Sequence, residues 1–349
     1  MSDIEFSLAP FASCVDEVVS FRNANRPIQR DHGYFEWRYR RRPCAEQAQI
    51  VWGADRQGRK FASASIIPHD FFVGDRVHAV GMLGDISVLP ECRGQGVGTR
   101  MIEFLHGAES LQRLLGCLVL PNDEAASAFE RAHWADATHI ERFVRIVDIA
   151  PRLRSRLGTS RAVDWLAGGF NVLLDARFRG TRANDGFETR AHQTPQFDSD
   201  YDRFWDEFPK AGRILAVRNR AYLNWRYAEH PSTRHGLFEL RLRDRLQGYV
   251  VFHAANDLVL VDDFLAVDLA RGAHLVSAFV AWTREQRVGA SIQVRWAGDA
   301  SSWAPWRNFG FVRRHDVQRV MTPPPSAGAS ALNGSEAQSW FVSAGDKDV

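Results

Sequence analysis

One segment of the sequence combines residue types that bind phosphate groups. Residues 85–100 read DISVLPECRGQGVGTR, and Arg93, Gly94, Gly96 and Gly98 fall where an expected strand passes into an expected helix. Glycines permit positive φ angles and close approach of a ligand, so several backbone N–H groups can point into one concavity. The N-terminus of the following helix adds partial positive charge. The segment therefore predicts a pyrophosphate site.

Two other phosphate-binding loops do not match this segment. A Walker A loop needs Gly-Lys-Ser or Gly-Lys-Thr, and the dinucleotide motif G-x-G-x-x-G needs a glycine where Thr99 stands. The alternative that remains open from the residues alone is a glycine-rich helix cap that binds nothing.

The same segment resembles motif A of the GNAT superfamily of acyl-CoA-dependent N-acyltransferases, V-x-P-x-x-R-G-x-G-x-G. The matching residues are Val88, Pro90, Arg93, Gly94, Gly96 and Gly98. Downstream, residues 120–134 are similar to the superfamily's N-x-x-A-x-x-x-Y-E-K-x-G-F segment, with Asn122 and Glu130 as outright matches. Both motifs lie within the first 150 residues, in the order that the superfamily has.

This resemblance implies acetyl-CoA as co-substrate, with its pyrophosphate on the loop and its thioester beside the preceding strand. The implied cofactor-binding residues are Ile86, Ser87, Val88, Arg93, Gly94, Gln95, Gly96, Val97, Gly98, Thr99, Asn122 and Phe129. The implied activity is N-acetylation of a primary amine on a small metabolite. The alternative function is a non-catalytic GNAT-fold protein that binds CoA or serves in assembly.

Acyl transfer to an amine also requires removal of one proton. Asp85, on the strand before the loop, is the best carboxylate for this catalytic role, and a strand-end turn residue is the equal alternative. Phe129 stands where many superfamily members have a tyrosine that can protonate the departing thiolate, so another group or water must do so. Asp31 and Glu36 could bind the ammonium group of the acceptor. We reject a covalent route through Cys92, because no histidine is placed by the sequence to act as its base.

An internal repeat predicts duplicated domains. The pattern YxxWRYxxxP occurs at residues 34–43 and again at residues 222–231. The expected fold is α/β (α+β), with two GNAT-like domains, each a mixed, mostly antiparallel central sheet flanked by helices. Upstream WRY elements also resemble bacterial tandem GNAT proteins, some associated with surface-polysaccharide biosynthesis, which makes an amino sugar or its nucleotide conjugate the first candidate acceptor.

The expected domains are a GNAT domain with the CoA loop at 1–150, a connector at 151–190, a degenerate GNAT-like domain at 191–320 and a disordered tail at 321–349. The second domain lacks RxxGxG, so we expect one CoA site per chain and a second domain that walls the acceptor cleft. Asp262 and Asp263 could hold the acceptor there, and an exposed turn is the favoured alternative for this acidic pair. The connector is Arg-rich and partly apolar. A packed connector is favoured over a membrane-surface helix, because two glycines weaken a free amphipathic helix.

Composition excludes several other classes of protein. Lys plus Arg is 44 and Asp plus Glu is 42, a net charge of +2 that gives no indication of nucleic-acid binding. No apolar run approaches the roughly 18 residues of a membrane span, and the N-terminal residues have no signal-peptide pattern. Four scattered cysteines predict neither a metal cluster nor a disulfide scaffold, so we expect a cytoplasmic protein. A monomer and a homodimer both remain open.

Overall fold

The structure is a computed structural model that describes residues 4–108, 111–177, 186–298, 304–324, 332 and 339–347. The first half contains β1 (Glu5–Pro10), α1 (Val15–Asn25), α2 (His32–Tyr39), β2 (Gln49–Ala54), β3 (Lys60–Val73), β4 (Arg76–Val88), α3 (Val97–His106), β5 (Cys117–Val119), α4 (Asp123–Arg131) and β6 (Ala135–Ile146). The helices α5 (Ala150–Leu157) and α6 (Arg161–Arg177) follow.

The second half repeats the order of the first, with two added strands. It contains β7 (Phe187–His192), α7 (Ser199–Glu207), β8 (Arg213–Ala216), α8 (Arg220–Leu223) with a wide helical turn (Asn224–Ala228), β9 (Gly236–Leu242), β10 (Arg245–Ala255), β11 (Leu258–Ala266), α9 (Leu269–Glu285), β12 (Ser291–Ala297), α10 (Ala304–Asn308), β13 (Val312–Thr322) and β14 (Ser339–Ser343). The additions are β8 and β14.

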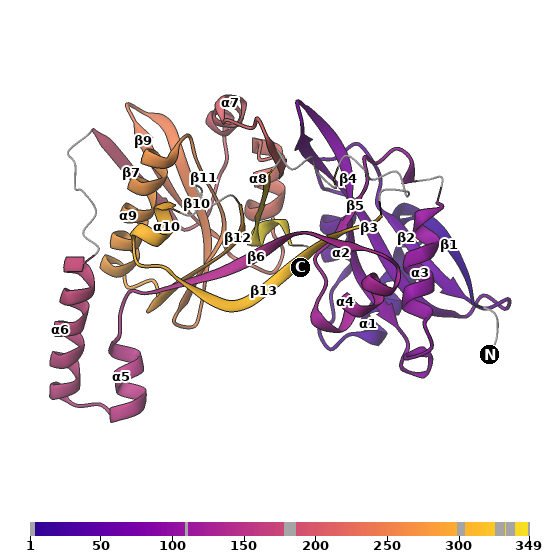
Figure 1. Cartoon of the computed structure of the whole chain (residues 1–349), viewed down its shortest axis with the longest axis horizontal. Helices are drawn as coiled ribbons and strands as arrows, with labels where there is room; N and C mark the ends of the chain where they lie inside the picture. The colour runs from indigo at the N-terminus through magenta and orange to yellow at the C-terminus, as the bar shows by residue number, and fades with distance from the viewer. Residues whose placement is uncertain are drawn as a thin grey trace.

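All strands join one mixed sheet with the order β1-β2-β3-β4-β5-β13-β6-β12-β11-β10-β9-β7, and β8 and β14 branch from this path. Two pairings in the main path are parallel, β4 with β5 and β11 with β12, while the others are antiparallel. In Figure 1 the first half forms one wing of the molecule and the second half forms the other. The predicted α/β class with a mixed, mostly antiparallel sheet is confirmed.

The last strand of the shared element order, β6 in the first half and β13 in the second, is exchanged between the wings. β6 of the first half pairs antiparallel with β12 of the second, and β13 of the second half lies between β6 and β5. Figure 1 shows β6 and β13 crossing together from one wing to the other. The two halves therefore share their central strands, and each wing contains one strand that comes from the other half.

The repeated WRY elements meet at the contact between the halves. Trp37 Nε1 donates to the Trp225 carbonyl at 2.8 Å, and Trp225 Nε1 donates to the Trp37 carbonyl at 2.8 Å. The two indole rings stack with centroids 5.3 Å apart. This reciprocal contact explains why the aromatic pattern occurs twice: each copy supplies half of one symmetric core contact.

The expectation of a disordered tail from residue 321 is wrong for the described part of that tail. β13 runs to Thr322, and β14 pairs with β8 and β12. Trp340, Phe341 and Val342 are buried, because they are three consecutive large apolar side chains that can enter the core. The many small and polar residues around them dominate the composition of the tail, and composition therefore predicted disorder. Residues 325–331 and 333–338 lie outside the described part.

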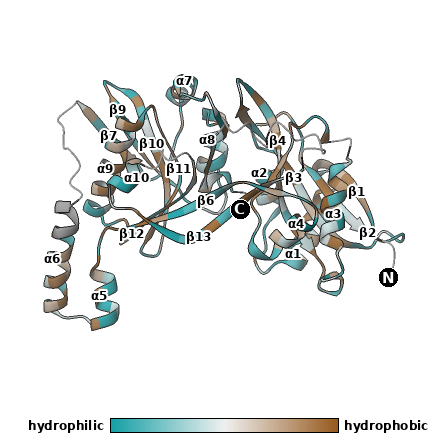
Figure 2. Ribbon diagram, in the orientation of Figure 1, coloured by the Kyte–Doolittle hydropathy of each residue, from teal (hydrophilic) through white to brown (hydrophobic). Residues whose placement is uncertain are grey.

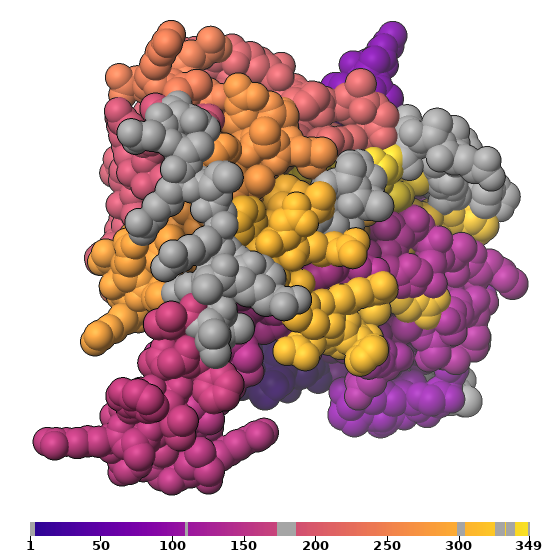
Figure 3. Space-filling model, turned by 60° about the vertical axis from the view of Figure 1, so that its left-hand side comes forward, coloured from indigo at the N-terminus to yellow at the C-terminus, as the bar shows by residue number. Residues whose placement is uncertain are grey.

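The expectation that the connector packs between the halves is also wrong. Helices α5 and α6 pair with each other, and Figures 1 and 3 show this hairpin projecting from the second-half wing. Figure 2 shows apolar residues along α6, and Trp165 is 82% exposed. Within the described residues, no helix has the length and apolar character that a membrane crossing requires.

Candidate active site

The glycine-rich loop between β4 and α3 lies where the parallel strands β4 and β5 separate. β4 pairs with β5 only from Gly81 to Leu83, opposite residues 117–119, and then continues alone to Val88. On its other side β4 pairs with β3, with a register shift between Ser63 and Ser65. Asp85 lies opposite that shift and has a φ of 54°, so the strand bends there. Among the described residues, the edge of β4 that faces away from β3 therefore has no strand partner from residue 84 onward.

The loop after β4 turns sharply into α3. Pro90–Cys92 form a short 3₁₀ turn that buries Cys92, and Gly94 and Gly96 have φ angles of 73° and 74°. Gly96 is the N-cap of α3. Val97, Met101, Ile102 and Leu105 are buried, which is the 3.6-residue periodicity that fixes α3 against the sheet. The packing of α3 thus holds the glycine-rich turn in place.

The backbone N–H groups of residues 94–99 have no hydrogen-bond partner among the residues that the structure describes. A Cβ added at Gly94, Gly96 or Gly98 would meet nothing within 4 Å. Gly94 and Gly96 need glycine for their positive φ, but Gly98 has neither a positive φ nor a close neighbour. The loop is therefore an open cradle of unpaired donors at a helix N-terminus.

Two arginines lie at this cradle with different roles. Arg93 Nε donates to the Val88 carbonyl at 3.0 Å, which ties the loop to the end of β4. Arg131, in the last turn of α4, donates from Nε to Thr99 Oγ1 at 3.3 Å, which places a guanidinium beside the start of α3. Arg131 was not among the residues predicted from the sequence. Its position next to the matched Glu130 was the only available signal.

Asp85 is held in a network of cations. Its carboxylate lies 2.9 Å from Arg22 Nη1, 2.6 Å from Arg26 Nη1 and 2.9 Å from Arg38 Nη2, and Tyr39 donates its hydroxyl to the same group. The Asp85 side chain is only 7% exposed. Both oxygens are thus engaged, and the geometry favours a positioning role, in which Asp85 fastens α1 and α2 to the bend in β4.

The other predicted site residues have local structural contacts. Asn122 is the N-cap of α4 and accepts a hydrogen bond from the Ala125 N–H at 2.9 Å. Phe129 is fully buried and packs edge-on against Trp134, with ring centroids 5.0 Å apart. Trp134 Nε1 donates to His106 Nε2 at 2.9 Å, and burial lowers the pKa of His106. Phe129 therefore occupies core space, in the cluster that also contains Val97 and Met101 of α3.

The two predicted acceptor residues lie at α2. Asp31 is its N-cap and accepts from the Tyr34 N–H at 2.8 Å, and Glu36 lies 3.5 Å from Arg40. Because Arg38 and Tyr39 of the same helix contact Asp85, α2 is adjacent to the bend in β4. The structure brings this helix to the site but gives both carboxylates local partners.

The corresponding position in the second half is built differently. Asp268 caps α9, and its carboxylate accepts from the Arg271 N–H at 2.8 Å. Gly272 is buried, and a Cβ there would lie 3.3 Å from Pro305. An acidic cap and a filled glycine position make this helix start unsuitable for a pyrophosphate.

Comparisons with known proteins agree with this geometry. Residues 47–134 match the family model described as acetyltransferase (GNAT) domain. No curated protein sequence matches the chain. Among solved structures, a conserved Enterococcus faecalis V583 protein given as a "Probable N-Acyltransferase" aligns with a TM-score of 0.62 at 10% identity, over 92% of this chain and 72% of that chain.

Two further solved structures are similar at low identity. A GCN5-related N-acetyltransferase from Anabaena variabilis aligns with a TM-score of 0.60 at 12% identity, over 91% of this chain and 72% of that one. Saccharomyces cerevisiae N-myristoyltransferase with bound myristoyl-CoA aligns with a TM-score of 0.51 at 10% identity, over 91% and 82%. Residues 47–134 match the GNAT-domain model, and the whole chain shares the fold of these GNAT-type structures.

Proposed function

We propose that the chain is an acetyl-CoA-dependent N-acetyltransferase whose pyrophosphate site is the cradle of residues 94–99. The observation that carries this proposal is Gly98. Its backbone would accept any residue and its surroundings are open, so the protein itself has no need for glycine there. A ligand that approaches the backbone closely accounts for the missing side chain. Unpaired N–H groups and the guanidinium of Arg131 supply complementary charge.

The pantetheine arm of CoA would lie along the unpaired edge of β4. Residues 86–88 offer backbone groups there, since β5 ends at Val119. In the reaction the amine nitrogen attacks the thioester carbonyl, the C–N bond forms and the C–S bond breaks. The amine loses one proton and the thiolate gains one. A backbone N–H of β4 would stabilise the negative charge that develops on the carbonyl oxygen.

The engaged state of Asp85 assigns these proton transfers to water in our proposal. Asp85 then positions the reacting strand, because it joins three arginines to the bend at which the thioester would lie. Phe129 contributes no acid, in keeping with its place in the core.

The acceptor is proposed to be a primary amine on a small metabolite, with an amino sugar or its nucleotide conjugate as first candidate. Asp31 and Glu36 are the proposed contacts for its ammonium group. We propose that the halves are duplicated GNAT-like domains, that only the first binds CoA, that the second closes the acceptor side, and that the protein acts in the cytoplasm. The myristoyl-CoA bound to the yeast neighbour makes a longer acyl group an alternative for the test.

Calorimetry and a thiol-release assay test the proposal together. Acetyl-CoA, CoA and myristoyl-CoA are titrated first, and release of free CoA is then followed with glucosamine, a nucleotide-linked amino sugar, an amino acid and a polyamine. One acetyl-CoA per chain with release that depends on an amine supports the enzyme. Tight binding without release for any amine supports the non-catalytic alternative, which the buried Phe129 favours. Absence of CoA binding refutes both.

A further inference from the structure

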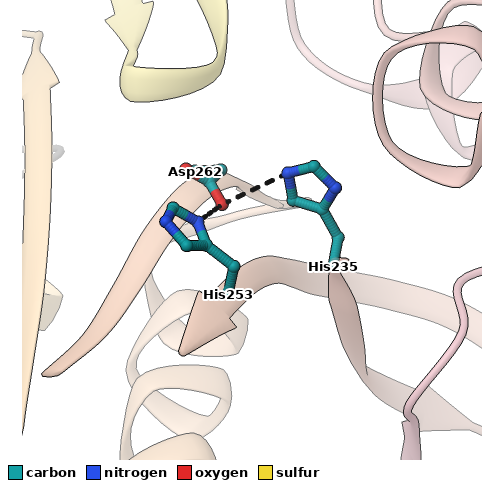
Figure 4. A group of neighbouring side chains, drawn as sticks. All are labelled: His235, His253 and Asp262. Atoms are coloured by element: carbon teal, nitrogen blue, oxygen red, sulfur yellow. Dashed lines mark hydrogen bonds and ion pairs between the residues drawn. The ribbon is translucent and has the colours of Figure 1, made fainter. Parts of the chain in front are cut away.

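Three potential metal ligands converge in the second half, away from the CoA cradle. His235 immediately precedes β9, His253 lies on β10 and Asp262 lies on β11, and Figure 4 shows their side chains pointing toward one another. One ligand atom from each residue lies within 4.8 Å of the others. They come from three neighbouring strands, so the sheet fixes their spacing.

The hydrogen bonds around His235 define which nitrogen can bind a ligand. His235 Nδ1 lies 3.1 Å from the Tyr227 carbonyl, and a carbonyl can only accept, so Nδ1 carries the proton. Nε2 then has a free lone pair and faces Asp262 Oδ2 at 3.7 Å. A carbonyl that orients one nitrogen while the other faces outward is the usual support of a metal-ligating histidine.

The two neighbouring carboxylates of β11 have separate partners. β10 and β11 change register between Val251 and Phe252, which pair with Asp263 and Val261, so Asp262 is the extra residue of a bulge. Asp263 is fully buried and bound by Arg218 at 3.1 Å. Asp262 instead contacts the two histidines, with Oδ2 2.5 Å from His253 Nδ1. The bulge therefore directs Asp262 into the histidine pair and away from the arginine.

We propose that His235, His253 and Asp262 bind a divalent transition metal ion, with Zn²⁺ as the best match. Two imidazoles and one carboxylate are a ligand set typical of Zn²⁺ sites that keep a fourth position for water. Tetrahedral coordination at the usual bond lengths puts ligand atoms about 3.3 Å apart. The observed 2.5 Å and 3.7 Å lie on either side of that value, so small side-chain rotations create the site.

The site has an open side through which an ion can reach it. The side chain of His253 is 24% exposed and that of Asp262 is 14% exposed, whereas His235 is buried behind them. Arg226 is a cation near His235, and its guanidinium donates to the carbonyls of Gly345 and Lys347 at 2.8 Å each. A ligand set with a single carboxylate is too poor in oxygen for Ca²⁺ or Mg²⁺.

Metal titration of the full chain tests the proposal. Protein stripped with a chelator is titrated with Zn²⁺ by calorimetry, and Co²⁺ is used as a coloured probe whose visible absorption reports tetrahedral coordination. We expect one ion per chain. Asp262→Asn keeps the side-chain shape and His253→Ala removes an imidazole, and each should weaken Zn²⁺ binding by roughly a hundredfold.

His315→Ala is the matched control, because His315 is an exposed histidine on β13 outside the cluster. Retained acetyl-CoA affinity and circular dichroism show that each variant is folded, and Asp262→Asn covers the case in which His253→Ala is unfolded. No binding to the parent chain, or equal binding by parent and Asp262→Asn, overturns the metal site and leaves a hydrogen-bonded His-Asp-His chain. Neither result bears on the CoA site.

A second inference rests on the α5–α6 hairpin. α6 packs against α5, and Val163 and Ala167 of α6, which are one turn apart, are buried. Four large apolar side chains of α6 are exposed, Trp165, Leu166, Phe170 and Val172, and the helical spacing puts Trp165 and Val172 opposite the buried pair and the other two beside it. Leu157 at the end of α5 is exposed as well. Half of the large exposed apolar side chains in the described chain thus lie on this one projection.

Exposed arginines lie on both helices of this hairpin. Arg152, Arg154, Arg156 and Arg161 are exposed, and Arg154 is paired with Asp164 at 2.8 Å across the two helices. Arg156 and Arg161 have no ion pair within the described residues. The positive charge of these arginines indicates what binds the exposed apolar side chains. A two-fold dimer through the hairpin would bring like-charged arginines together, whereas anionic lipid headgroups complement them. We infer that the hairpin docks on an anionic membrane surface.

Vesicle sedimentation tests this inference. The full chain should bind vesicles of phosphatidylcholine mixed with phosphatidylglycerol, bind pure phosphatidylcholine poorly, and be released by salt. The double change Arg156→Glu with Arg161→Glu should weaken binding by at least about thirtyfold. Trp165→Ser with Phe170→Ser should weaken binding to a similar extent. Leu269→Ser is the control, because Leu269 is an exposed apolar residue elsewhere.

Two results overturn the membrane inference. One is equal sedimentation with neutral and anionic vesicles, or none with either. The other is a concentration-dependent dimer, seen in solution by ultracentrifugation, that the Trp165→Ser with Phe170→Ser change abolishes, since that assigns the face to a second copy.

Discussion

Replacing Gly98 with alanine separates the needs of the protein from those of its ligand. Gly98 is the second residue of α3, its φ is not positive, and an added Cβ would meet nothing within 4 Å. The change from glycine to alanine at such a position lowers the entropy of the unfolded chain and stabilises a protein by about 0.4–1 kcal/mol. Taken alone, the protein should therefore tolerate or prefer alanine.

The ligand should respond in the opposite direction. The added methyl group would stand among the unpaired N–H groups of residues 94–99, in the space assigned to the pyrophosphate. A hydrogen bond to a charged group contributes about 1.5–3 kcal/mol. Loss of one such bond should weaken acetyl-CoA binding roughly 10- to 150-fold. Gly98→Asp should weaken it further, because its charge favours the helix N-terminus but repels phosphate.

Calorimetric titration with acetyl-CoA and urea unfolding, done on the same preparations, measure the two effects. Gly107→Ala is the matched control, because Gly107 ends the same helix and a Cβ there would also meet nothing within 4 Å. It should leave affinity unchanged. Gly98→Ala protein that is at least as stable as the parent and binds acetyl-CoA with unchanged affinity would refute the assignment of the cradle.

Three further predictions concern the shared core. Trp37→Phe should lower the free energy of unfolding by about 1–3 kcal/mol in urea titrations, since it leaves the buried carbonyl of Trp225 unpaired. Asp346→Ala should cost about 3 kcal/mol in the same assay, because Arg218 is fully buried and loses a partner at 2.5 Å. Burial holds the pKa of His69 well below its usual value, so the folded state binds fewer protons than the unfolded state. Below about pH 6.5 stability should fall by up to 1.4 kcal/mol per pH unit, and His69→Phe should flatten that slope in unfolding measured against pH.

The local features of the site were predictable from the sequence. Consecutive residues indicate the change from strand to glycine turn to helix. The apolar residues between Val97 and Leu105 have the spacing of a helix that is buried on one side. The WRY repeat likewise predicted a repeated element order. Each of these depends on neighbours within one or two turns of the chain, where sequence patterns are informative.

The features that the sequence did not reveal all depend on distant partners. Asp85 was predicted to be the catalytic base because its ion pairs could not be foreseen. Two of its partners, Arg22 and Arg26, lie about sixty residues upstream in the sequence. β14 was missed because five residues become a strand only when β8 and β12 provide edges. The exchange of β6 and β13 leaves no local signal in the sequence. The residue pattern of each strand is compatible with pairing to a strand of its own half or to a strand of the other half.

The strand exchange gives a physical reason for a second half without a phosphate loop. β4 and β5 separate beyond Leu83, and the strand beside β5 at that point is β13, which pairs Met321 with Val119. A strand of the second half, β13, thus lies next to β5 on the far side of the gap between β4 and β5 that the thioester would use. A chain cut near residue 150 would lose β13 and β12 and leave β5 and β6 with unpaired edges, a state that favours aggregation. Acceptor selectivity is therefore best probed by point substitutions in the intact chain, since removal of the second half removes part of the first.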